Sequence, residues 1–238
     1  MKSQIPLDEE IIATKSFITL PLRPESFFFP IVYLGSALIL SLVYWLYPQF
    51  GRNYLCAYRN KVLNQQYYRL FTGMLLHSNF THFLSNAPFI LIFGAQLNNY
   101  FSWRLFPVLA VATGIITHGI SIYSYDYQVN LLGSSGLVYV LWGMWLPLLL
   151  ISKKHIKGSK KWLKIAGFSL VMFIPASFSP RTSYRTHYIG LICGLLVISI
   201  YIIFNYKKIE ARNFALFEKL SKEKYSKETS GFSHQLWN

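Results

Sequence analysis

The stretch NLLGSSGLVYVLWGMW, from Asn130 to Trp145, places two glycines and two serines directly in front of a strongly apolar run. The apolar part is typical of a membrane helix, in which a hydroxyl group is costly unless it finds a hydrogen-bond partner. A membrane helix that begins with Gly133-Ser134-Ser135-Gly136 therefore holds polar groups at membrane depth. The rest of the chain indicates why polar groups would be held at this depth.

The composition favours a membrane protein. Of the 238 residues, 53% are hydrophobic, 18% are aromatic and only 13% are charged, whereas a typical soluble domain has about 25% charged residues. Between Glu25 and Glu210 the only carboxylate is that of Asp126. Carboxylates are rare inside bilayers, so this middle region is where membrane spans are expected.

Six apolar stretches predict an all-α membrane protein with six transmembrane helices. They cover residues 27–47, 83–97, 105–122, 136–151, 162–178 and 188–204. The second and fourth are short and reach spanning length only if their polar flanks, around His82 and Ser135, also lie within the bilayer. The expected organisation is an N-terminal segment (1–26), a six-span domain (27–206) and a basic tail (207–238).

The positions of lysine and arginine predict the orientation. Residues 153–164 carry six lysines and no acid, and the tail after residue 206 is also basic. Both are predicted to be cytoplasmic, and an even number of spans then puts both termini inside. The net charge of +14 fits this topology and attraction to anionic membrane lipids, without requiring a nucleic acid.

Polar residues gather at one end of three parallel spans under this topology. His82 and Asn86 begin the second span, Ser135 begins the fourth and His187 begins the sixth. His82 and Asn86 are four residues apart and share a helix face, as Ser135 and Tyr139 do. A serine and a histidine are thus expected at matching depth in one half of the bilayer.

Small residues predict how these spans meet. Gly136 and Gly143 on the fourth span, and Gly190 and Gly194 on the sixth, allow two helices to approach closely. Such contact would bring the serine of the fourth span within reach of His187. Serine needs a base to lose its proton, and histidine is the usual base near neutral pH.

The chain resembles the rhomboid family of intramembrane serine proteases. Gly133-Ser134-Ser135-Gly136 matches the family's GxSG motif, and HYIGLICG (187–194) resembles its H-x2-G-x3-G stretch. HSNFTHFLSN (77–86) resembles its H-x4-H-x3-N stretch, and YYRLFTGMLLH (67–77) its first-loop segment. All four occur in the family's order within residues 27–206, which makes the resemblance specific.

The resemblance implies a role for each matching position. Ser135 would be the nucleophile and His187 its general base, in a dyad without an acid. The Ser135 backbone N–H, His82 and Asn86 would form the oxyanion hole. The implied supporting residues are Tyr139 beneath the His187 ring, Arg69 bracing the outer loop, His77, Gly133, Gly136, Gly190 and Gly194.

Two positions depart from the family pattern. Thr186 stands where a small residue usually precedes the histidine of the sixth span. Gln96, Asn98 and Asn99 occupy a region where the family frequently has a carboxylate. The second departure concerns a structural brace more than the chemistry.

Single residues and the chain as a whole each admit another interpretation. Ser135 alone could be a packing residue, Ser134 is predicted to be structural, and His118 a satisfied helix-contact histidine. A metal site formed by His77, His82 and His187 lacks a completing carboxylate or cysteine. The main alternative is a catalytically inactive rhomboid-like protein that binds membrane clients. A transporter is disfavoured, since no inverted repeat or charged pathway is visible.

The sequence therefore predicts an intramembrane serine endopeptidase that acts on single-pass membrane proteins. Zinc and aspartyl intramembrane proteases are disfavoured, because the chain has neither an H-E-x-x-H motif nor a pair of intramembrane aspartates. The resemblance implies no cofactor and no metal. The expected location is a multi-pass protein of the bacterial inner membrane.

Overall fold

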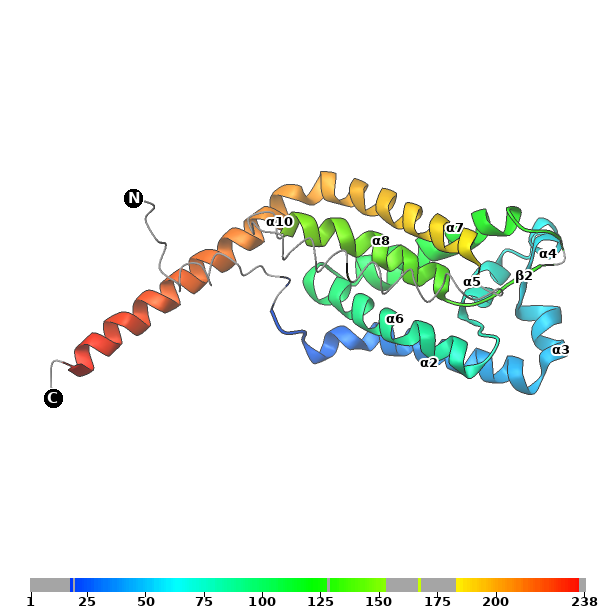
Figure 1. Ribbon diagram of the computed structural model, residues 1–238, viewed down its shortest axis with the longest axis horizontal. Helices are drawn as coiled ribbons and strands as arrows, with labels where there is room; N and C mark the ends of the chain where they lie inside the picture. The colour runs from blue at the N-terminus through cyan, green and yellow to red at the C-terminus, as the bar shows by residue number, and fades with distance from the viewer. Residues whose placement is uncertain (1–17, 19, 128, 153–166, 168–182, 236–238) are drawn as a thin grey trace.

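The computed structural model describes residues 18, 20–127, 129–152, 167 and 183–235. Long helices form a bundle, and a group of short elements covers one end of it (Figure 1). The long helices are α2 (Phe28–Leu46), α6 (Phe80–Tyr100), α7 (Ala110–Tyr123), α8 (Ser135–Ser152) and α10 (Tyr184–Gln235). The predicted span over 162–178 lies outside the described residues, apart from residue 167.

Among the described residues, four helical segments are long and apolar enough to cross a membrane. They are Pro24–Leu46, Arg104–Tyr123, Ser135–Ser152 and Tyr184–Leu216. The prediction of a multi-pass, mostly helical membrane protein is therefore confirmed in this coarser form. The full set of six spans and the side on which the termini lie remain predictions.

The helix α6 is longer than the apolar stretch that predicted it. It has 21 residues and begins at Phe80, where the Asn79 side chain accepts the backbone N–H of His82 at 2.8 Å. This side-chain cap satisfies a backbone donor at the helix start. Hydropathy alone therefore placed the beginning of this helix too late, because its first turn is polar.

Three of the long helices, α6, α8 and α10, run in the same direction (Figure 1). The N-termini of α6, α8 and α10 lie at the end covered by the short elements, which we call the site end (Figure 1). The opposite end, where α6 and α8 finish and α10 continues outward, is the tail end. α10 does not stop near residue 204, as the sequence predicted for the last span, but continues as one helix of 52 residues.

Short elements connect α2 to α6 at the site end. In chain order they are α3 (Pro48–Phe50), η3 (Gly51–Leu55), β1 (Ala57–Tyr58), α4 (Arg59–Leu63) and α5 (Tyr68–Leu75). The strand β1 pairs antiparallel with β2 (Asn130–Leu131), which lies in the connection from α7 to α8. This pairing ties the segment that leads to Ser135 to the α2–α6 connection.

At the tail end, other connections join the long helices. η2 (Pro24–Phe27) precedes α2, and η4 (Arg104–Leu109) joins α6 to α7. Asn98 Nδ2 donates to the Ser26 carbonyl at 3.1 Å, and Arg23 Nε donates to Asn99 Oδ1 at 3.1 Å. The amides that stand where the family frequently has a carboxylate thus tie α6 to the N-terminal segment.

The helix α8 forms the centre of the bundle. Every residue from 136 to 145 is buried, and α8 packs against α6, α7 and α10. A helix that is apolar on all sides is expected in such a position. By contrast, α10 exposes Ile192, Leu196 and Ile200 on its outer face, as a helix in contact with lipid would.

Glycines let α8 and α10 approach each other closely. A Cβ atom added at Gly190 would lie 2.5 Å from the Gly136 carbonyl oxygen, and one at Gly194 would clash with the Val140 carbonyl. Thr186 is accommodated because its methyl group faces Gly136, where an added Cβ would lie 2.9 Å from it. The larger residue before His187 is therefore compatible with close helix packing.

Candidate active site

Three helix N-termini converge at the site end, and each carries residues of the predicted site. Ser135 is the first residue of α8 and is half-buried, whereas His187 lies in the first turn of α10 and is buried. Helix N-termini carry a partial positive charge from their unpaired N–H groups. This end of the bundle is therefore suited to stabilise a negative charge.

The His187 ring is held by aromatic packing. It stacks on the Tyr139 ring with centroids 4.2 Å apart and an interplanar angle of 14°, and the Tyr184 ring meets it edge-on at 6.4 Å. Nδ1 of His187 is buried and has no hydrogen-bond partner in the described part of the chain. The imidazole plane is thus fixed by stacking, and no described carboxylate bonds to it.

The candidate nucleophile lies one helical turn before Tyr139. Among the residues that the structure describes, Ser135 Oγ has no hydrogen bond to His187 or to another side chain. The close contact of Gly136 with Gly190 places the helices that carry Ser135 and His187 side by side. Hydrogen bonds between a nucleophile and its base are often long without substrate and tighten when substrate binds.

The neighbouring serine is fully engaged. Ser134 is buried, and its hydroxyl donates to the Met74 carbonyl at 2.8 Å, so the Tyr33 hydroxyl must donate to it at 3.0 Å. The Ser134 backbone N–H donates to Nε2 of His77 at 3.3 Å. These bonds support the prediction that Ser134 is a structural residue.

His77 fixes the backbone just before the candidate nucleophile. Its Nδ1 must donate to the Leu75 carbonyl at 3.1 Å, which leaves Nε2 free to accept the Ser134 N–H. Burial, with a smaller contribution from nearby His82, lowers the pKa of His77 to about 3. His77 is therefore neutral near physiological pH, with a single tautomer.

Three residues of α2 complete this arrangement, and the sequence analysis missed them. Besides Tyr33, Ser41 Oγ accepts the backbone N–H of His77 at 3.0 Å, and Trp45 Nε1 donates to the His77 carbonyl at 2.7 Å. Tyr33, Ser41 and Trp45 are separated by multiples of four residues, so they share one helix face. The sequence signal that could have identified these three residues is the recurrence of polar atoms on one face of an apolar span.

His82, one of the residues predicted to form the oxyanion hole, lies against Gly133. The His82 ring covers Gly133, where an added Cβ would be 2.7 Å from its Cε1. Gly133 has φ of +112°, which favours glycine, and its N–H donates to the Gly73 carbonyl at 3.0 Å. Asn86 is buried, and its Nδ2 donates to the His82 carbonyl at 2.9 Å. An amide has a second N–H, which remains for another acceptor.

Comparison with known proteins decides the family. The Rhomboid domain matches residues 64–204, which is more than half of the chain. The chain belongs to the rhomboid family. It is similar to "Putative rhomboid protease YdcA" of Bacillus subtilis (strain 168), with 26% identity over 159 residues that cover 66% of this chain and 75% of that protein. The resemblance read from the motifs is confirmed.

Arg69 of this rhomboid protein lies where a brace of the α2–α6 connection was expected. It is only 2% exposed. Its guanidinium donates to Gln66 Oε1 at 2.6 Å, to the Cys56 carbonyl at 3.0 Å and to the Asn53 carbonyl. These bonds join three parts of the connection that pairs with β2.

A row of buried polar side chains on α7 faces the start of α8. An added Cβ at Gly136 would lie 3.5 Å from both Thr117 and His118. His118 Nδ1 bonds the Gly114 carbonyl at 3.3 Å. Thr117 Oγ1 and Ser121 Oγ are buried without partners among the described residues. The prediction that His118 is a helix-contact histidine is supported by its bond to Gly114.

The histidines do not assemble a metal site within the described residues. No group of three or more His, Cys, Asp or Glu side chains there could hold a metal ion. The His77 and His82 rings are 5.1 Å apart and perpendicular in arrangement. Both nitrogens of His77 are already engaged in hydrogen bonds.

Proposed function

We propose that this rhomboid protein is an intramembrane serine endopeptidase that hydrolyses peptide bonds in or next to transmembrane segments. Ser135 is the nucleophile and His187 the general base. The observation that carries the proposal is the stacking of His187 on Tyr139, one turn along α8 from the half-buried Ser135. No described contact engages the Ser135 hydroxyl, whereas the hydroxyl, N–H and carbonyl of Ser134 are all hydrogen-bonded.

The reaction proceeds through an acyl-enzyme. Ser135 Oγ attacks the substrate carbonyl carbon as His187 takes its proton, and His187 then gives this proton to the leaving amine. Water next attacks the ester, with His187 again acting as base. No cofactor takes part in these steps.

The negative charge of the tetrahedral intermediate is stabilised by hydrogen-bond donors. The Ser135 backbone N–H, the second N–H of Asn86 and the His82 ring form the oxyanion hole, and the N-terminus of α8 adds its partial positive charge. His82 and Asn86 lie on adjacent turns of the same helix face. The Asn86 side chain donates a hydrogen bond to the His82 carbonyl. The donors are therefore held in place before substrate binds.

The topology that accompanies this function has six spans, with 1–26 and 207–238 in the cytoplasm and 27–206 forming the protease domain in a bacterial inner membrane. The site end then faces outward. Substrates are single-pass membrane proteins embedded in the same lipids. The peptide groups of a substrate helix are sealed by internal hydrogen bonds, so the helix must partly unwind before Ser135 can reach a carbonyl. Cleavage then falls at or just below the outer membrane boundary.

Labelling with a serine-directed phosphonate tests the nucleophile. Purified wild type should be labelled and Ser135→Ala should not, whereas Ser134→Ala is the matched control and should retain labelling. Equal labelling of wild type and Ser135→Ala would overturn the assignment. Absence of labelling and of cleavage in the wild type would favour the alternative, a catalytically inactive rhomboid protein that binds membrane clients.

A further inference from the structure

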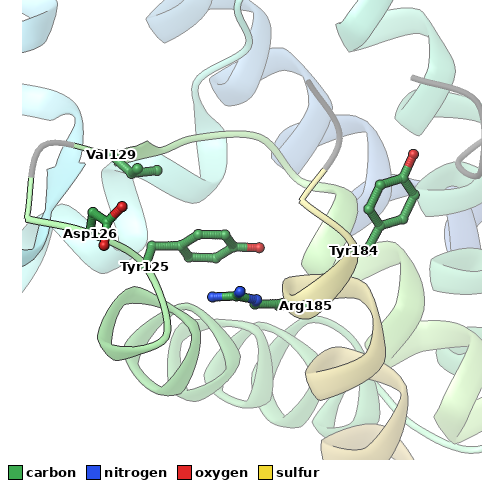
Figure 2. Close-up of a pocket in the computed structure, with 5 residues that line it drawn as sticks. All are labelled: Tyr125, Asp126, Val129, Tyr184 and Arg185. Carbon is green, nitrogen blue, oxygen red and sulfur yellow. The ribbon is translucent and has the colours of Figure 1, made fainter. Parts of the chain in front are cut away.

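A set of contacts at the site end joins the α7–α8 connection to the first turn of α10. Figure 2 shows Tyr125, from the connection, lying beside Arg185 of α10. We call this set the loop clamp. It consists of Ser124, Tyr125, Ser183, Arg185 and Thr186.

The loop clamp is a continuous path of polar and aromatic contacts. Arg185 Nη1 donates to the Ser124 carbonyl, and its guanidinium lies 5.5 Å from the centroid of the Tyr125 ring. The Tyr125 hydroxyl bonds Ser183 Oγ at 2.5 Å, and Ser183 Oγ bonds Thr186 Oγ1 at 2.5 Å. The connection is thus held to α10 at two separate points.

The two sides of the loop clamp lead directly to the two residues of the proposed dyad. Thr186 precedes His187, and its methyl group packs against Gly136, the residue after Ser135. Tyr125 begins the segment that runs through β2 to Ser135. A shift of the first turn of α10 would therefore move His187 relative to Gly136 and Ser135.

Building on the proposed function, we propose that Tyr125 and Arg185 are positioning residues that set His187 relative to Ser135. Arginine suits this place because its planar guanidinium can lie over a ring while one N–H reaches a carbonyl. Lysine has a compact charge on a flexible stem and cannot do both in the same way.

The exposure of the loop clamp predicts whether its removal affects turnover or stability. Tyr125 and Arg185 line an open pocket of about 410 Å³, together with Asp126, Val129 and Tyr184 (Figure 2). Arg185 is exposed, and exposed charged contacts contribute little to stability. Catalysis is far more sensitive to small displacements of reacting groups than folding is. The loop clamp should therefore affect turnover more than stability.

The variants Tyr125→Phe, Arg185→Ala and Arg185→Lys test this role. Each should lower kcat and the rate of phosphonate labelling roughly 10- to 100-fold, since a misplacement of about 1 Å can have an effect of this size. KM and the midpoint of thermal unfolding should stay close to those of wild type. Ser183→Ala removes the bond to Tyr125 and also the bond to Thr186, so the double variant Tyr125→Phe/Ser183→Ala should lose little more than Ser183→Ala alone.

Two matched controls have contacts outside the loop clamp. Tyr127→Phe removes a hydroxyl from the same connection but keeps the ring on which Arg59 lies, 4.4 Å from its centroid. Arg104→Ala removes an arginine that lies over Trp103 at 5.9 Å, at the tail end. Both should keep wild-type kcat.

The outcomes separate the loop clamp from the proposed function. If wild type is labelled at Ser135 but the clamp variants keep its kcat, the positioning role is overturned alone. It is also overturned if kcat falls only in proportion to a loss of thermal stability. If wild type is neither labelled nor active, the proposed function is overturned and the positioning role with it.

Discussion

The two ends of the bundle use polar side chains in different ways. At the tail end, Arg212 donates to the carbonyl of Tyr100, the last residue of α6, and Asn213 donates at 3.1 Å to that of Ser152, the last residue of α8. These bonds satisfy backbone acceptors that a helix end leaves open. At the site end, in contrast, His187 Nδ1 is buried without a partner in the described part of the chain.

The difference follows from the direction of the helices. The N-termini of α6, α8 and α10 meet at the site end and give it a partial positive character, whereas the C-termini of α6 and α8 at the tail end are negative. An oxyanion that develops next to Ser135 would lie at the N-terminus of α8, which is the favourable end of that helix for a negative charge. Under the proposed function, polar side chains therefore serve stability at the tail end and chemistry at the site end.

The largest expected effect concerns the proposed dyad. Ser135→Ala and His187→Ala should each lower kcat by about 10⁴-fold or more, because each removes a group without which the covalent step fails. The double variant should lose little beyond either single variant, since the two residues act as one unit. Cleavage of a tagged single-span protein, followed by mass spectrometry of the product ends, measures this.

Ser134→Ala is expected to behave differently from Ser135→Ala, although the two serines are adjacent. It should leave most of the activity but lower the free energy of unfolding by about 1–3 kcal/mol, because the Tyr33 hydroxyl and the Met74 carbonyl lose their partner. For the dyad itself, the contradicting outcome is additivity. If the decrease in kcat of the Ser135→Ala/His187→Ala double variant equalled the product of the two single decreases, these residues would not act together.

The oxyanion donors should give the next largest effect. His82→Ala and Asn86→Ala should each lower kcat by about 10²–10³-fold with the fold retained. KM should change less, because the ground-state carbonyl needs these donors less than the tetrahedral intermediate does. Near-normal rates in both variants would show that the negative charge is stabilised elsewhere at the site end.

Much of the site could be predicted from sequence because its residues are local. Ser135 with Tyr139, and His187 with Gly190 and Gly194, belong to short motifs on single helices, so their spacing alone places each set on one face. The close approach of α8 and α10 followed from glycines whose missing side chains make room for the backbone of the other helix.

The remainder depends on contacts between distant segments. Tyr33 and Ser41 reach the surroundings of Ser134 and His77 across intervals of 101 and 36 residues. No local pattern specifies such pairs. The buried polar side chains of α7 that face Gly136 likewise depend on how α7 lies against α8. The length of α10 was underestimated because the helix continues beyond its apolar part into a charged sequence.

A smaller effect is expected from the titration of His77. Its pKa of about 3 in the folded protein lies below the value of about 6.5 expected when unfolded. Below pH 6.5 the unfolded chain therefore binds a proton that the folded protein does not, and stability falls as the pH is lowered. His77→Gln should be less stable than wild type at pH 7.5 but should lose less stability between pH 7.5 and 5, measured as thermal midpoints in detergent.

Ser41→Ala is the matched control for His77. It removes the acceptor of the His77 N–H but keeps the titratable ring, so it should lower stability at both pH values and retain the wild-type dependence on pH. Parallel pH curves for wild type and His77→Gln would show that His77 does not contribute to the pH dependence.

The smallest effect is expected at the tail end. Arg212→Ala and Asn213→Ala should each lower the free energy of unfolding by about 0.5–1.5 kcal/mol, because each leaves a C-terminal carbonyl of α6 or α8 without a donor. Arg212→Lys should recover part of the loss, since a positive charge near a helix C-terminus is favourable. The kcat of all three variants should stay within about twofold of wild type, because the length of α8 separates these carbonyls from Ser135 and a mutation distant from the reacting groups acts on rate only by displacing them. If Arg212→Ala instead lowered kcat as far as His82→Ala does, α10 would transmit displacements from the tail end to His187, and the separation between an end for stability and an end for chemistry would fail.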